Sequence, residues 1–125
     1  MTAKRHFEES SLREEYAEYV FLGRLCGTAW RRNLPVEVLR AATDAFGYDI
    51  VLSCGGTVRH VQLKTTLVDG KTGRFSINRN LSRQPSGCIV WLVLDPEDLT
   101  VQGINWFGGP PGVPLILPDR EVRHT

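Results

Sequence analysis

Residues 46–66 read FGYDIVLSCGGTVRHVQLKTT, and this stretch decides the fold of the chain. Two apolar runs lie on either side of the Gly55-Gly56 pair, which predicts two adjacent antiparallel strands joined by a tight turn. Ile50–Leu52 is apolar at every position, which is typical of a strand covered on both faces. In the second run the two-residue strand period places Val61, Leu63 and Leu67 on one face and His60, Gln62 and Lys64 on the other.

Three polar side chains of this hairpin suggest chemistry. Asp49 begins the first strand, and Gln62 and Lys64 lie on the second. If both strands are covered, these groups lie in a partly enclosed place. A carboxylate, an amide and an ammonium that converge in a cleft suit a divalent cation and a phosphate. The alternative is a hairpin with ordinary polar positions and no site.

The order of these residues resembles the PD-(D/E)xK nuclease superfamily. The segment Gln62-Leu63-Lys64 is similar to the Gln-x-Lys variant of Mrr-type restriction endonucleases, and its surroundings resemble small uncharacterised bacterial relatives. The resemblance extends from about Glu15 to Asp95: a helix with an acid, an extended segment, Asp49, a hairpin and Gln-x-Lys. It implies a restriction-endonuclease-like α/β fold, in which an N-terminal helix packs on a mixed central β-sheet.

The resemblance also implies roles for individual residues. Asp49, Gln62, Lys64 and Glu18 are the expected catalytic set, and the cofactor is Mg²⁺ or Mn²⁺. The metal ligands would be Asp49, Gln62, Glu18 and the backbone carbonyl of Leu63, while Lys64 would position water or offset phosphate charge. Two departures from the family are the lack of a proline before Asp49 and the neutral amide of Gln62 in place of an acid.

Glu18 is the expected helix acid because it lies beside the apolar face of an amphipathic helix. Its neighbours on that face are Phe21, Leu22 and Leu25, and a carboxylate directed inward needs a partner. Glu15 is the alternative, and both acids could instead face solvent. Of the other polar residues, Asp44 is expected to form a turn and His60 to have a structural role.

Four basic residues follow the hairpin and form a possible nucleic-acid rim, since phosphate contacts dominate affinity for DNA. They are Lys71, Arg74, Arg79 and Arg83. The alternative interpretation is that these residues form an ordinary solvated surface. Trp106 and Phe107 are expected to pack in the core or at a sheet edge rather than stack on a base.

Composition sets the remaining bounds. A chain of 125 residues, 42% hydrophobic and 23% charged, is expected to be one domain, 1–125. Its net charge of +1 gives no global nucleic-acid signature. Cys26, Cys54 and Cys88 are too widely spaced for a zinc site or a disulfide framework. No apolar run reaches the ~20 residues of a membrane span, so a cytoplasmic protein without a membrane partner is expected.

The other elements follow from apolar spacing and turn residues. We expect an amphipathic helix from Ser10 or Ser11 to about Ala29. Shorter elements are a strand at 36–39, a strand at 75–77, and one or two helical turns at 78–84. Cys88–Leu94 is apolar throughout and predicts a central strand, and 101–107 predicts an edge strand. The sheet should have about four to six strands.

The expected function is a metal-dependent nuclease that hydrolyses DNA phosphodiester bonds. One alternative is a catalytically silent module of this fold that binds nucleic acid or a protein. Another is an inhibitor or immunity-type module. We expect no separate domain for sequence recognition within 1–125, so a homodimer or a partner protein is expected to supply specificity.

Overall fold

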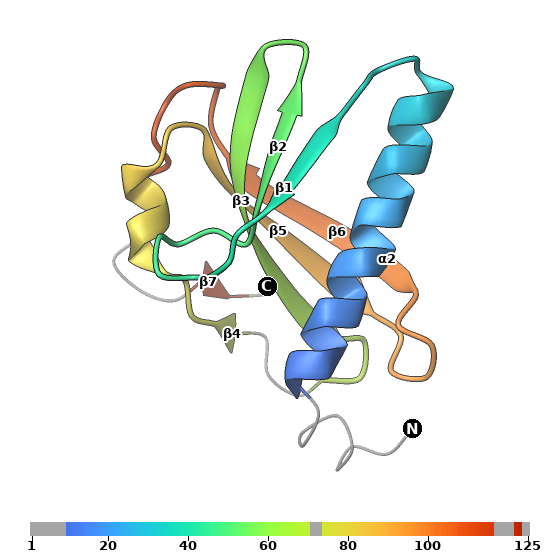
Figure 1. Ribbon diagram of the computed structural model, residues 1–125. Coiled ribbons are helices and arrows are strands. Elements are labelled where there is room, and N and C mark those ends of the chain that lie inside the picture. Colours follow the sequence, from blue (N-terminus) through green and yellow to red (C-terminus); the bar gives the residue numbers. More distant parts are fainter. Residues whose placement is uncertain (1–9, 71–73, 117–121, 124–125) are drawn as a thin grey trace.

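The computed structural model describes residues 10–70, 74–116 and 122–123. Helix α2 (Ser10–Arg31) packs against one face of a five-stranded mixed sheet, so the expected α/β arrangement with an N-terminal helix is confirmed (Figure 1). The sheet order is β1 (Glu37–Arg40), β2 (Ile50–Cys54), β3 (Thr57–Leu67), β5 (Gly87–Leu94) and β6 (Val101–Gly108). A small second sheet pairs β4 (Arg74–Phe75) with β7 (Val122–Arg123).

The predicted hairpin of β2 and β3 is confirmed. The two strands pair antiparallel from Ile50 opposite Val61 to Cys54 opposite Thr57. Gly55 and Gly56 form the turn with φ of 56° and 84°, the left-handed values that a two-residue hairpin turn requires. Strand β3 then pairs parallel with β5, whereas the other neighbours in the large sheet are antiparallel.

The core lies between α2 and the sheet. Ala17 from the helix and Ile50, Val61 and Leu92 from the sheet are almost fully buried there. The predicted central strand is β5, which is buried at every position except Val93. Burying one large aliphatic side chain contributes about 1.5–3 kcal/mol, so this central strand anchors the elements that carry the site.

The opposite face of the sheet is covered by the short 3₁₀ helix η1 (Arg79–Arg83), which confirms the expected helical turns. Leu81 of η1 is fully buried and packs with Ile89 and Leu115. The chain before β2 passes so close to η1 that a Cβ on Gly47 would lie 2.2 Å from the backbone nitrogen of Leu81. Gly47 has φ of +88°, so both its conformation and its surroundings require glycine.

Some expectations are corrected. The helix ends at Arg31 rather than near Ala29, and the strand expected at 75–77 is β4, Arg74–Phe75. Only Ile50 of the run Ile50–Leu52 is buried, because β2 has just the short β1 on its outer side.

The edge strand β6 is also more open than expected. Trp106 and Phe107 are 56% and 42% exposed, and they lie on the strand at the edge of the five-stranded sheet. Among the described residues, none of the helices is long and apolar enough to cross a membrane.

Candidate functional site

Asp49 is fixed at the start of β2, between the two neighbouring strands. Its backbone N–H donates to the carbonyl of Val61 at 2.8 Å, and its own carbonyl accepts from the N–H of Ala41 at 2.9 Å. Its carboxylate Oδ2 accepts a 2.6 Å hydrogen bond from the backbone N–H of Leu63. The side chain is therefore directed across β3 rather than into bulk water.

Helix α2 brings Glu18 to the same place. Ala17 is buried against the sheet, so the next residue lies at the boundary between helix and sheet, and the Glu18 side chain is only 13% exposed. Its two oxygens accept from Nε and from a terminal nitrogen of Arg40 on β1, each at 3.1 Å. The hydrogen bonds and charge of the Glu18 carboxylate raise the pKa of Arg40 above its ordinary value, so the guanidinium keeps its charge.

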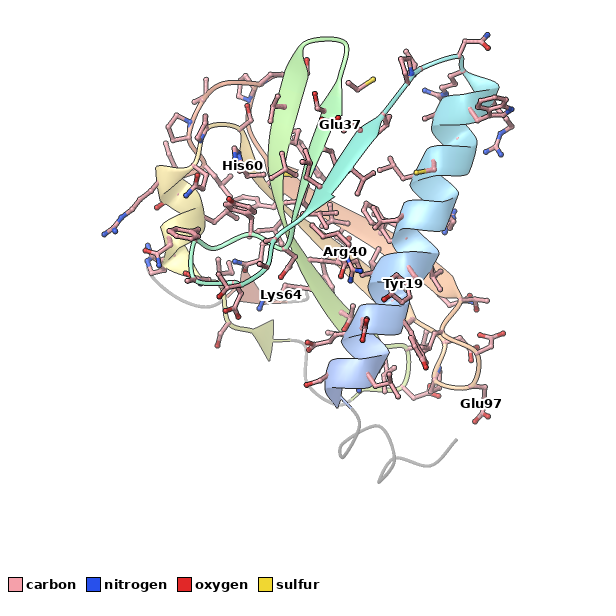
Figure 2. All side chains as sticks on the ribbon, viewed as in Figure 1. Tyr19, Glu37, Arg40, His60, Lys64 and Glu97 are labelled. Carbon is pink, nitrogen blue, oxygen red and sulfur yellow. The ribbon has the colours of Figure 1, made fainter. Side chains whose placement is uncertain are left out.

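Arg40 also has an aromatic partner. The central carbon of its guanidinium lies 4.9 Å from the centre of the Tyr19 ring, the distance of a cation–π contact. Figure 2 shows Arg40 and Tyr19 together where β1 approaches α2. Tyr19 in turn donates its hydroxyl to Glu15 at 2.6 Å. The helix acids and the strand arginine thus form one connected group.

Two adjoining clefts share the residues Glu18, Arg40 and Asp49. The first has a volume of about 230 Å³ and is lined by Ser11, Glu14, Glu15, Glu18, Arg40, Asp49, Leu63 and Thr65. The second has a volume of about 370 Å³ and is lined by Glu18, Arg40, Ala41, Ala42, Thr43, Asp44 and Asp49. Asp49 and Glu18, far apart in sequence, therefore face the same space.

This space is electrostatically unfavourable for another negative charge. Burial raises the pKa of Asp49, and the nearby charges of Glu18 and Asp44 raise it further. The hydrogen bond from Leu63 and the charge of Lys64 lower the pKa but do not compensate. A cation between these acids would be stabilised by the charges that disfavour ionised Asp49.

Thr65 is a cleft residue that the sequence interpretation missed. It lines the first cleft with Leu63, and its hydroxyl oxygen is buried without a hydrogen-bond partner among the described residues. An unpaired buried hydroxyl costs about 1–3 kcal/mol. Strand alternation could have found it, because Thr65 shares the face of Val61 and Leu63 rather than that of Lys64.

Gln62 lies on the other face of β3 and is 4% exposed. Its Nε2 donates to the carbonyl of Gly47 at 2.7 Å, and its Oε1 accepts from the N–H of Asn78 at 3.3 Å. The amide thus joins β3 to the loop before β2 and to the start of η1. Its role as a metal ligand stays a prediction, and it would have to share an oxygen that Asn78 already uses.

Lys64 follows Gln62 on that face and is half-buried. In Figure 2 it lies toward β4, whereas Arg40 and Tyr19 lie beside α2. The positive charge of Lys64 nevertheless lowers the pKa of the Asp49 carboxyl. Asp49 therefore shares its clefts with Glu18 and Arg40 and is also close enough to Lys64 to be affected by its charge.

The remaining candidates have simpler surroundings. Arg79 and Arg83 are exposed on η1, Arg74 is described only by its backbone in β4, and Lys71 lies outside the described residues. His60 contacts the carbonyl of Pro85 through Nδ1 at 2.7 Å and packs edge-on against Tyr48. These contacts fit a structural histidine.

Comparison with known proteins gives one structural likeness. The fold is similar to that of the bacterial homing endonuclease I-Ssp6803I, with a TM-score of 0.46 and 19% identity. The alignment covers 92% of this chain and 80% of that one. No family model matches the sequence, and no curated protein does.

The cleft contains the oxygen ligands that Mg²⁺ and Mn²⁺ bind, namely the carboxylates of Asp49 and Glu18. The carboxylate of Glu18 is paired with the guanidinium of Arg40. The hydroxyl of Thr65 lacks a hydrogen-bond partner among the described residues. Within the described ranges no group of three or more His, Cys, Asp or Glu could hold a metal. Two carboxylates thus face one cleft, and a divalent cation held there would have to keep several of its own waters.

Proposed function

We propose that this protein is a metal-dependent nuclease of the restriction-endonuclease-like PD-(D/E)xK type that hydrolyses DNA phosphodiester bonds. The observation that carries the proposal is the meeting of Asp49 and Glu18 in one cleft, from a strand start and a helix 31 residues apart in sequence. The order of Asp49 and Gln-x-Lys along the hairpin supports it. Both features together are more specific than either acid alone.

In this proposal Asp49, Glu18 and the backbone carbonyl of Leu63 hold Mg²⁺ or Mn²⁺, and Gln62 adds a neutral oxygen. The bound cation would make a water more acidic and offset charge on the phosphate. Leu63 N–H keeps the Asp49 carboxylate in one orientation. Lys64 is the residue that orients the phosphate or the attacking water.

The DNA would reach this site along the basic rim. Arg79 and Arg83 are exposed on η1, and Lys71 and Arg74 precede them in the chain. A second copy or a partner protein would supply sequence recognition. Strand β6 is a suitable place for that contact, because Val101–Gly108 contains no charged residue and leaves Ile104 and Trp106 about half exposed at the sheet edge. We place the protein in the cytoplasm.

A second candidate is a catalytically silent module of the same fold that binds nucleic acid or protein. The observation that favours it is that two of the expected metal ligands, Glu18 and Gln62, are hydrogen-bonded to other residues of the protein. Glu18 pairs with Arg40 through both oxygens, and Gln62 is bonded to Gly47 and Asn78. In that case Glu18 and Gln62 would stabilise the fold near the cleft instead of holding a metal.

Cleavage assays distinguish the two candidates. The purified protein is incubated with linear, supercoiled, single-stranded and branched DNA, and with RNA, in Mg²⁺ or Mn²⁺ and in EDTA. The nuclease proposal expects cation-dependent cleavage that Asp49→Asn removes and Glu97→Gln, an exposed acid in the β5–β6 turn, leaves unchanged. Binding of DNA without cleavage in any cation supports the silent module.

A further inference from the structure

We propose that Arg40 is the phosphate-binding residue of this site and that cation entry controls it. Without a cation, Arg40 holds Glu18. When a cation takes the Glu18 carboxylate, the guanidinium is released to bind a phosphate of the substrate. This inference deepens the proposed function and rests on it.

The geometry of the pair supports an exchange. Both oxygens of Glu18 accept from Arg40 at 3.1 Å, so a cation bound to a Glu18 oxygen would compete with the guanidinium for the charge of the same carboxylate. The two residues also differ in exposure. The Glu18 side chain is 13% exposed and the Arg40 side chain 47%. The carboxylate is thus largely shielded at the helix–sheet boundary, whereas about half of the Arg40 side chain is open to solvent.

The position of Arg40 suits a phosphate ligand. It lines both clefts together with Asp49 and Glu18, so a phosphate next to a cation at Asp49 would lie within its reach. A guanidinium binds a phosphate through two parallel N–H donors, as it now binds Glu18. Tyr19 lies under the guanidinium at 4.9 Å and offers a surface that keeps it near the cleft after release.

If Arg40 and the cation compete for the Glu18 carboxylate, removing the arginine should tighten cation binding. Loss of the internal competitor in Arg40→Gln should tighten Mn²⁺ binding by about 1.4- to fivefold, the range that one partly exposed ion pair supplies. The same variant should bind DNA more weakly in Mn²⁺. The slope of log affinity against log salt should fall by about 1, because one phosphate contact is lost.

The test uses the full chain. Isothermal titration calorimetry gives the Mn²⁺ affinity of wild type, Arg40→Gln, Arg40→Lys and Arg24→Gln. Arg24 is exposed on α2 and lines neither cleft, so Arg24→Gln controls for loss of one positive charge. DNA affinity is measured by fluorescence anisotropy at several salt concentrations in the Lys64→Ala background, in which we expect no cleavage. Arg40→Lys keeps the charge but not the two parallel bonds, so its salt slope should match that of its parent.

Each outcome decides the inference. Tighter Mn²⁺ binding with a smaller salt slope in Arg40→Gln alone supports it. Weaker Mn²⁺ binding in Arg40→Gln, or an unchanged salt slope, overturns it and leaves the nuclease proposal standing, because wild type still binds the cation. If wild type binds no Mn²⁺ at millimolar concentration, the nuclease proposal itself fails and the exchange mechanism fails with it.

Discussion

The carboxylate of Asp49 accepts a 2.6 Å hydrogen bond from the backbone N–H of Leu63, the middle residue of the Gln-Leu-Lys segment. This bond ties the start of β2 to the strand that carries the other expected site residues. It also favours the charged form of Asp49, but burial has the larger effect and raises the pKa. The ionised side chain that a cation site needs is therefore unfavourable for the apo protein.

Asp49→Asn should stabilise the metal-free protein at neutral pH. Between the ordinary pKa of 3.8 and the higher folded-state pKa, the native state binds more protons than the unfolded state. The free energy of unfolding consequently falls as pH rises through that window. Asparagine keeps an oxygen for the Leu63 N–H and carries no charge. Thermal denaturation should give a higher Tm for Asp49→Asn at pH 7, with the difference closing as pH falls toward 3.8. A lower Tm at pH 7 would contradict the effect of burial.

Much of the fold could be predicted because its signals are local. The Gly55-Gly56 pair between apolar runs determines the hairpin, and the unbroken run Cys88–Leu94 determines the central strand. The position of Glu18 was also within reach, because the helical spacing of apolar residues places it beside Phe21 and Leu22, which pack against the core.

Other features depend on contacts that no local pattern encodes. The pairing of Glu18 with Arg40 joins residues 22 positions apart and requires β1 to lie beside α2. The amide of Gln62 is held by Gly47 and Asn78 from two separate loops. Sequence alternation placed Gln62 and Lys64 on one face of β3. It could not show that Asp49 lines a cleft on the helix side of the sheet.

Glu18→Gln should weaken Mn²⁺ binding and preserve the fold. The substitution removes a charged group that we propose as a metal ligand, together with one half of an ion pair whose arginine is about half exposed, so stability should fall by no more than about 1 kcal/mol. Calorimetry and thermal denaturation measure the two effects. Glu15→Gln is the matched control, because Glu15 lines the same cleft and lies nearly one turn earlier. Equal losses in both variants would mean that the cleft attracts the cation only through its overall charge.

Gln62→Ala should destabilise the protein by about 2–4 kcal/mol, because it leaves the carbonyl of Gly47 and the N–H of Asn78 without their buried partner. Gln62→Glu should destabilise it as well. A glutamate supplies no donor for Gly47 and places a charge at a position that is 4% exposed. Urea denaturation of both variants tests this, with exposed Gln102→Ala expected within about 0.5 kcal/mol of wild type. Wild-type stability in Gln62→Ala would show that these bonds contribute little.

Gly47→Ala should destabilise the protein by about 2–4 kcal/mol. The new methyl group would lie 2.2 Å from the nitrogen of Leu81, and φ of +88° is strained for any residue with a Cβ. The loop before β2 and η1 would have to separate, which also disturbs the Gln62 bonds. Gly23→Ala is the opposite case, because nothing lies within 4 Å of its Cβ position in α2. It should stabilise by about 0.5–1 kcal/mol. Chemical denaturation that ranked the two variants in the reverse order would refute this account.

Lys64→Ala should reduce cleavage at least about 100-fold while leaving Mn²⁺ affinity within about twofold of wild type. The reason is that Lys64 supplies a positive charge near Asp49 but no ligand atom for a cation. Lys64→Arg keeps the charge and should retain part of the activity. Single-turnover cleavage and calorimetry on the same preparations measure the two effects separately.

Two results would count against this role for Lys64. Cleavage at the wild-type rate in Lys64→Ala would remove the residue from the mechanism. Parallel loss of cleavage and Mn²⁺ binding, with a lower Tm, would mean that its half-buried side chain supports the fold of β3 instead. If wild type cleaves and Lys64→Ala binds Mn²⁺ without cleaving, the variant has lost a reaction step of an active nuclease. In a catalytically silent fold, wild type would not cleave either.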